Sequence, residues 1–219
     1  MVSQAEENYL KTVFKLSEKT EGSISTKSIS LEMNTAAASV TDMLKRLSEK
    51  GYVLYEKYKG VRLSEKGQKL ATGLIRRHRL WEVFLLEKLN FAWDEVHDIA
   101  EELEHIQSEK LINRLEAFLG YPKYDPHGGP IPDKDGKITV RQQILLSEMK
   151  TGEKGVLVGV QEESTPFLQY LNRVNLRLGT AVEIKELFDY DSSVSIIIND
   201  DVEVIISNKV SQNLFIKKE

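Results

Sequence analysis

Residues 95–106, EVHDIAEELEHI, constrain this chain more than any other stretch, because metal-ligating side chains recur there with the period of an α-helix. At about 100° per residue, such a helix would hold four of them within an arc of roughly 100°, with the apolar residues opposite. The four are His97, Glu101, Glu104 and His105. A second predicted helix, residues 76–89, carries His78 and Glu82 four positions apart, again on one face. Imidazole and carboxylate together suit divalent transition metals, although such a face can also be merely solvated.

The composition excludes several other kinds of chemistry. The chain has no cysteine, which removes disulfides, thiolate metal sites and iron–sulfur clusters. No apolar run reaches membrane-spanning length, and residues 1–11 lack a signal-peptide pattern. We therefore expect a cytoplasmic protein with no membrane partner.

Residues 1–79 hold 15 Lys and Arg against 9 Asp and Glu, and the remainder holds 15 against 25. This asymmetry favours nucleic acid as a partner of the basic part, unless it is incidental.

The basic part has the pattern of a winged helix-turn-helix. Apolar spacing predicts helices over residues 6–18, 27–33 and 36–50, with a tight turn at Asn34 and Thr35. Two short strands, 52–55 and 61–63, flank a basic turn and predict the wing. Small residues leading the third helix would allow close approach to DNA, and basic wing residues would contact phosphates. The predicted DNA-binding residues are Thr35, Ala36, Ala37, Ser39, Thr41, Lys45, Lys57, Lys59 and Arg62. The alternative is a winged helix that contacts protein.

The rest of the chain divides into a helical part, a linker and a β part. Residues 68–119 are nearly all helical, and LWEVFLLEKL has more large apolar residues than one small domain can bury, which favours a dimer interface over packing on the winged helix alone. Residues 121–136 hold four of the five prolines and form a loop, in which His127 is expected to be a loop residue rather than a ligand. Residues from 138 onward predict about five strands and a short helix, in a small barrel. No catalytic motif is present, so we predict no enzyme.

Taken together, HRLWE, VHDIAEELEH and DPHGGPIP resemble segments of the diphtheria toxin repressor family, which are iron- and manganese-responsive transcriptional regulators. The resemblance covers the whole chain. It implies a mainly α protein with small β parts (α+β), built from four segments. These are a winged helix-turn-helix DNA-binding domain (1–73), a helical metal-binding and dimerisation domain (74–120), a proline- and glycine-rich linker (121–137), and an SH3-like (FeoA-like) β-barrel (138–219).

The resemblance implies two metal sites. His78, Glu82 and His97 match one of them, and Glu163 looks like the barrel carboxylate that completes it. A further barrel ligand of the family, a glutamine, falls on Pro166 and is not matched.

The second implied site departs further from the family pattern. Glu101, Glu104 and His105 match its ligands, and the helix-1 ligand falls on Asn8. Manganese-type members carry a carboxylate three residues later, where this chain has Lys11, so the binuclear manganese arrangement of the family is in doubt.

The resemblance also implies the function. Glu101 stands where manganese-type members have Glu and iron-type members have Cys, and oxygen donors suit the harder Mn²⁺, whereas sulfur favours softer ions. His97 and the barrel are features of the iron type. We predict a homodimeric repressor of metal-homeostasis genes that binds Mn²⁺ or Fe²⁺, with Zn²⁺ and Co²⁺ as substitutes in vitro. Metal would tie the winged helix to the dimer core and set the spacing of two recognition helices on a palindromic operator in double-stranded DNA. His105→Ala or Glu104→Ala should then abolish metal-stimulated DNA binding.

Two other hypotheses remain open at this stage. The first is a winged-helix regulator that responds to an organic ligand, in which the His and Glu side chains are only solvated. The second is a metalloenzyme that uses the same cluster with an open coordination position.

Overall fold

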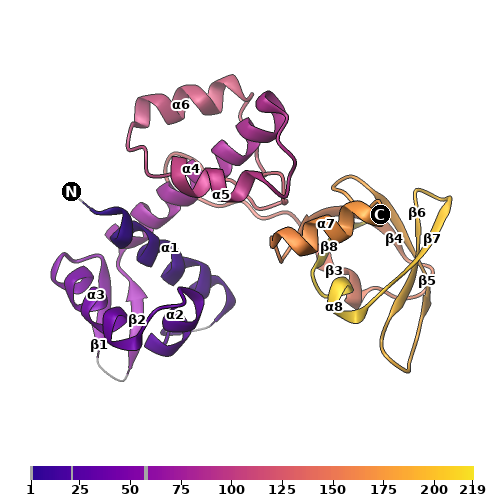
Figure 1. The fold of residues 1–219 in the computed structure, drawn as a ribbon, viewed down its shortest axis with the longest axis horizontal. Coiled ribbons are helices and arrows are strands. Elements are labelled where there is room, and N and C mark those ends of the chain that lie inside the picture. Colours follow the sequence, from indigo (N-terminus) through magenta and orange to yellow (C-terminus); the bar gives the residue numbers. More distant parts are fainter. Residues whose placement is uncertain (1, 21, 57–58) are drawn as a thin grey trace. The chain divides into compact units, whose positions relative to one another are not determined.

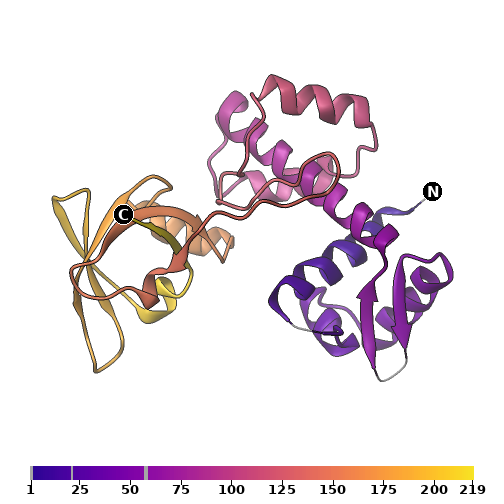
Figure 2. The ribbon, with the colours of Figure 1, turned by 180° about the vertical axis from the view of Figure 1, so that it is seen from behind.

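The computed structural model describes residues 2–20, 22–56 and 59–219. Its described residues form eight α-helices, one short 3-10 helix and eight strands (Figures 1 and 2), in agreement with the predicted α+β class. The helices are α1 (Gln4–Lys19), α2 (Thr26–Glu32), α3 (Ala37–Glu49), α4 (Glu65–Leu89), α5 (Val96–Leu103), α6 (Glu109–Phe118), α7 (Thr165–Arg173) and α8 (Asn208–Ser211), and the 3-10 helix is η1 (Leu146–Glu148). The strands are β1 (Val53–Glu56), β2 (Gly60–Leu63), β3 (Ile144–Leu145), β4 (Lys154–Val160), β5 (Ala181–Leu187), β6 (Val194–Ile198), β7 (Val202–Ile206) and β8 (Leu214–Lys218).

The chain folds into two compact units, each built from separate stretches of sequence. The first unit comprises Met1–His78, Leu103–Glu109 and Pro132–Ile138. The second unit comprises Arg79–Glu102, Lys110–Ile131 and Thr139–Glu219. No helix among the residues described is both long and apolar enough to span a membrane.

The first unit contains the winged helix-turn-helix. Its helices begin at good N-caps: Ser3 and Glu6 form a capping box at α1, and the Ser25 hydroxyl accepts a hydrogen bond at the start of α2. Asn34 makes the turn before α3 with φ +47°, a left-handed conformation that asparagine tolerates. Strands β1 and β2 pair antiparallel with Val53 opposite Leu63, which forms the wing seen in Figure 2. Apolar residues of α1, α2, α3 and the wing close a common core.

Helix α4 is a single helix of 25 residues, whereas the sequence predicts a separate helix over residues 76–89. It begins just after Ser64, whose hydroxyl accepts the backbone N–H of Gly67 at 3.1 Å. Gly67 is needed there because a Cβ atom would lie 2.0 Å from the carbonyl oxygen of Tyr52. His78 and Glu82 therefore both lie on α4, one turn apart, as the sequence predicts.

The helix predicted over residues 95–106 is wrong in its length. Helix α5 ends at Leu103, and Glu104 and His105 lie in the turn that follows it. The Arg77 side chain donates a hydrogen bond from Nε to the carbonyl oxygen of Glu104 at 2.6 Å, which satisfies a carbonyl that has left the helical pattern. The ideal helical arc of four ligands consequently does not form, because only His97 and Glu101 are helical residues of α5.

The second unit contains a six-stranded antiparallel sheet in the order β3-β8-β4-β5-β6-β7. Bulges in β4, between Leu157 and Gly159, and in β5, between Ile184 and Glu186, interrupt its register and are expected to bend its strands. Buried apolar residues of the sheet and of α7 form its core. A smaller apolar cluster lies among α4, α6 and the following loop, with Leu80, Val83 and Ile112 at its centre.

Candidate metal centre and DNA-binding surface

Three buried acidic and imidazole side chains meet in the second unit. They are Glu82 from α4, which is 1% exposed, and Asp125 and His127 from the proline-rich loop, which are 5% and 0% exposed. Each offers one potential ligand atom within 4.8 Å of the others. His127 Nδ1 lies 3.5 Å from Glu82 Oε1. A divalent cation would add compensating charge beside two buried carboxylates, of which Asp125 is also paired with Arg79.

The other ring nitrogen of His127 fixes how this imidazole is presented. Nε2 lies 2.8 Å from the carbonyl oxygen of Trp93, which can only accept, so Nε2 carries a hydrogen and donates it. Nδ1 is buried with no hydrogen-bond partner among the described residues. A histidine ligand characteristically donates its second ring N–H to a backbone carbonyl or a carboxylate. His127 has that arrangement, and its remaining nitrogen points toward Glu82.

The loop that carries Asp125 and His127 is held tightly. Asp125 Oδ1 accepts the backbone N–H groups of His127 at 2.8 Å and Gly129 at 2.9 Å, while Oδ2 lies 3.1 Å from Arg79 Nε. Gly128 has φ +88°, and a Cβ atom there would lie 2.2 Å from the carbonyl oxygen of Val158. The loop is therefore a defined structure that positions both side chains, although its prolines and glycines look like a linker in the sequence.

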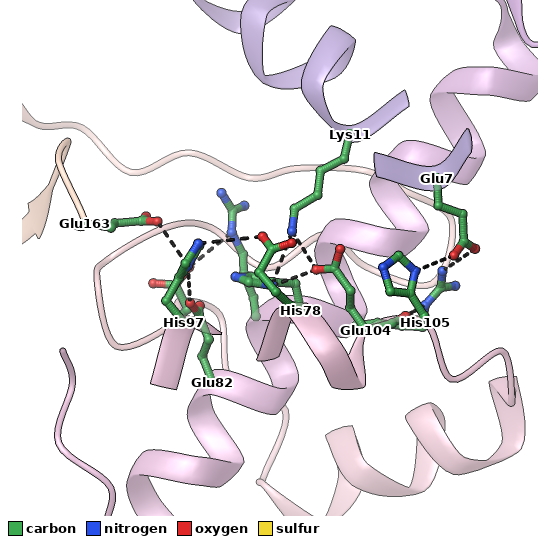
Figure 3. A network of polar contacts seen from close by, with 12 residues as sticks. Glu7, Lys11, His78, Glu82, His97, Glu104, His105 and Glu163 are labelled. Atoms are coloured by element: carbon green, nitrogen blue, oxygen red, sulfur yellow. Dashed lines mark hydrogen bonds and ion pairs between the residues drawn. The ribbon is translucent and has the colours of Figure 1, made fainter. Parts of the chain in front are cut away.

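His97 extends this cluster toward the surface. Its Nδ1 lies 3.3 Å from Glu82 Oε1 and 3.7 Å from Glu163 Oε2, and its Nε2 lies 3.6 Å from Glu101 Oε1. Figure 3 shows the side chains of Glu82 and Glu163 directed at the ring of His97. Four predicted ligands of the second unit, Glu82, His97, Glu101 and Glu163, are thus brought together by α4, α5 and the segment before α7.

The charges of this cluster shift the pKa values of its members. Burial alone would lower the pKa of His127, but the nearby, negatively charged carboxylate of Glu82, with Asp125 adding to it, raises that pKa to about 9. Burial and the charge of Glu82 raise the pKa of Asp125 to about 6, against the opposing effect of Arg79. The site therefore favours binding of a positive charge, which is a proton on His127 when no other cation is bound.

Sequence reasoning missed Asp125 and His127 as part of this cluster. It placed His127 correctly in a loop but treated it as a residue without a binding role. The available signal was the short pattern DPHGG, in which an Asp caps its own turn and the glycines allow close backbone approach.

The remaining predicted ligands lie in the first unit, where they contact side chains of the chain itself. Glu104 is fully buried and forms an ion pair with Lys11, and His78 lies against the same carboxylate. His105 pairs with Glu7, a residue that the sequence analysis did not select. Asn8 Oδ1 and Glu104 Oε1 are buried without a hydrogen-bond partner in the described part of the chain.

The predicted DNA-binding residues lie on an accessible surface of the winged helix. Ala36, Ala37, Ser39, Lys45, Lys59 and Arg62 are exposed, and Thr35 and Thr41 are half-buried. Ala36 is the N-cap of α3 and provides no side-chain hydrogen bond, so the first backbone N–H groups of α3 remain available to a phosphate. Two of the cations have acidic neighbours, since Lys59 pairs with Glu56 at 2.7 Å and Lys45 with Asp42 at 3.7 Å. Lys57 lies outside the described residues.

A winged helix-turn-helix joined to a buried His and carboxylate cluster defines a class of DNA-binding proteins with a metal centre. Family models match almost the whole chain: "Iron dependent repressor, N-terminal DNA binding domain" over residues 1–61, "Iron dependent repressor, metal binding and dimerisation domain" over residues 64–133, and the FeoA domain over residues 144–218. The chain belongs to the iron-dependent repressor family, which includes the diphtheria toxin repressor.

Individual relatives agree with this assignment. The chain is 30% identical over 159 residues to the iron-dependent repressor IdeR of Mycobacterium leprae, a match that covers 69% of each protein. It is 26% identical to the diphtheria toxin repressor of Corynebacterium diphtheriae, with 91% of each covered. A solved "Manganese-dependent transcriptional repressor complex with manganese" has a TM-score of 0.88 at 29% identity and covers 98% of this chain and 100% of that one.

The matches to some relatives are shorter. The chain spans about half the length of several other IdeR proteins, 54% for that of Mycobacterium bovis. It spans 17% of a "Probable metal transport system membrane protein" from Chlamydia trachomatis.

Proposed function

We propose that this protein is a homodimeric transcriptional repressor whose DNA binding is activated by a divalent metal ion, Mn²⁺ or Fe²⁺. The observation that carries the proposal is the buried Glu82, Asp125 and His127 cluster in a chain that also has a winged helix. The similarity to a manganese-dependent transcriptional repressor solved with manganese, which extends over nearly the whole chain, supports the same function.

In this proposal the metal is bound by Glu82, Asp125 and His127, with His97, Glu101 and Glu163 as neighbouring donors. The metal supplies positive charge and coordination. Helix α4 and the Asp125 loop position the ligand side chains, and the Trp93 carbonyl orients His127. The three main ligands are almost wholly buried, which suits a structural ion better than the open coordination position of a metalloenzyme. We infer that the protein is not an enzyme.

The donor set favours Mn²⁺ over softer ions. Carboxylate oxygens and imidazole nitrogens are its only donors, and the chain has no cysteine. Fe²⁺ accepts the same donors, and so do Zn²⁺ and Co²⁺ in vitro. Manganese is therefore the preferred hypothesis, and the relative activating concentrations of Mn²⁺ and Fe²⁺ decide between them.

For DNA, we propose that α3 enters the major groove and that Lys59 and Arg62 contact the backbone. Large apolar side chains of α4 and α6 remain accessible in a single chain, among them Leu89, Leu111 and Phe118, and they suit a dimer interface. A symmetric dimer would bind a palindromic operator of double-stranded DNA, at metal-homeostasis genes in the cytoplasm. Metal raises DNA affinity only by its preference for the DNA-competent state.

Fluorescence anisotropy with the protein's own promoter DNA tests this function. Binding is compared in chelator, in Mn²⁺ and in anaerobic Fe²⁺ at one fixed salt concentration, because salt alone changes such affinities by orders of magnitude. We expect tighter binding with metal. Equal binding in chelator and metal would reject metal activation and favour a regulator that responds to an organic ligand.

A further inference from the structure

Glu104 receives a cation from the chain itself. Lys11 Nζ lies 2.5 Å from Glu104 Oε2, and His78 Nδ1 lies 2.7 Å from the same oxygen and 3.3 Å from Lys11 Nζ. All three side chains are buried, and Figure 3 shows the ammonium of Lys11 directed at Glu104 and His78. The ammonium thus contacts a carboxylate and an imidazole, the two groups that a divalent cation would otherwise bind.

This ammonium cannot easily give way to a metal ion. Lys11 projects from α1, a helix fixed by its capping box and by the apolar core beneath it. A divalent ion at Glu104 would place like charges side by side in a buried region, where their repulsion is weakly screened. A metal ion could bind Glu104 only after Lys11 had moved away, and the buried ammonium would then lose its paired carboxylate.

The second carboxylate of this region is also paired with a cation. Glu7 Oε1 lies 3.2 Å from Arg77 Nη2 and accepts a hydrogen bond from Gln107 Nε2 at 3.0 Å. Its other oxygen lies 2.6 Å from His105 Nδ1. His105 is therefore paired with Glu7, while Glu104 is paired with Lys11. Cationic side chains of this chain therefore already compensate both carboxylates, while Glu104 Oε1 and Asn8 Oδ1 have no hydrogen-bond partner among the described residues.

We propose that Lys11 is a built-in cation that replaces a metal ion at Glu104, so that each chain binds one divalent ion and binds it at the Glu82, Asp125 and His127 cluster. The α1 helix is then joined to the Glu104 segment with or without metal. The position of the single ion rests on the function proposed above, whereas the exclusion of metal from Glu104 rests only on the contacts of Lys11.

The test is the number of Mn²⁺ ions bound per chain, measured by equilibrium dialysis and elemental analysis of the full-length protein. We expect one ion in the wild type and two in Lys11→Glu, which supplies a carboxylate where the ammonium lies. The matched control is Lys15→Glu, one turn further along α1, for which we expect one ion. Two ions in the wild type, or one ion in a folded Lys11→Glu variant, would overturn the proposal.

A second variant keeps the test decisive if Lys11→Glu does not fold. Glu104→Gln should leave the count at one and the Mn²⁺ affinity within about twofold of wild type, and loss of a bound ion would overturn the proposal. A wild type that binds no Mn²⁺ would instead reject the metal site proposed at Glu82. A gain of one ion in Lys11→Glu would still support the role of Lys11 in that case.

Discussion

Metal binding at the Glu82, Asp125 and His127 cluster should depend on pH because a proton occupies His127 when metal is absent. Burial would lower the pKa of His127, but Glu82 and Asp125 raise it to about 9. Below pH 9 the metal must displace this proton, so apparent affinity falls as pH decreases. Asp125, with a pKa raised to about 6 by burial and by Glu82, is mostly ionised at pH 7 and adds a second proton only below about pH 6.

These values set the size of the effect. Because pH 7 lies about two units below the pKa of His127, competition from the proton should weaken Mn²⁺ binding by about 100-fold, or about 3 kcal/mol. Raising the pH from 7 to 8 should therefore strengthen binding about tenfold. Each ion bound at pH 7 should release about one proton from this histidine.

Isothermal titration calorimetry measures both the Mn²⁺ affinity and the number of protons released. The titrations are made at about pH 7.0, 7.5 and 8.0, in buffers of different ionisation enthalpy. His127→Gln should bind Mn²⁺ weakly and lose the proton release. His105→Gln, which changes a histidine paired with Glu7 in the first unit, should keep it. A wild-type affinity that does not change with pH, with no proton released, would refute the assignment of His127 as a protonated ligand.

Three further predictions concern the site, its loop and the DNA surface. Glu82→Gln should weaken Mn²⁺ binding at least about tenfold in a calorimetric titration, while Glu87→Gln, an exposed residue of the same helix, should not; equal affinities would remove Glu82 from the site. Gly128→Ala should lower the free energy of unfolding by more than the typical cost of about 1–3 kcal/mol for a left-handed residue, because its Cβ would meet the backbone. The control is Gly152→Ala, since Gly152 has a similar φ and open space around it; equal losses of unfolding free energy in urea would contradict this prediction. Arg62→Ala should reduce the slope of log affinity against log salt by roughly 0.9 if Arg62 neutralises one phosphate; an unchanged slope in anisotropy measurements would exclude that contact.

Short-range features of the chain specify its helices and strands and the kinds of chemistry available to it. Helical spacing, N-caps such as Ser3 and Ser25, and the turn at Asn34 act over a few residues, so the winged helix could be predicted directly. The absence of cysteine removed thiolate donors. The placement of His78 and Glu82 one turn apart on a helix could also be predicted, because it depends only on residues close together in the sequence.

Which candidate ligands lie close together depends instead on long-range packing. The predicted arc on residues 95–106 assumed an unbroken helix, but α5 ends at Leu103, and Glu104 is held by side chains from α1 and α4 that are distant in sequence. His127 became a candidate ligand because its loop folds against α4 and its Nε2 meets the Trp93 carbonyl. Long-range packing determines that the Nε2 of His127 meets the Trp93 carbonyl and that its Nδ1 faces Glu82. A local sequence pattern predicts neither contact.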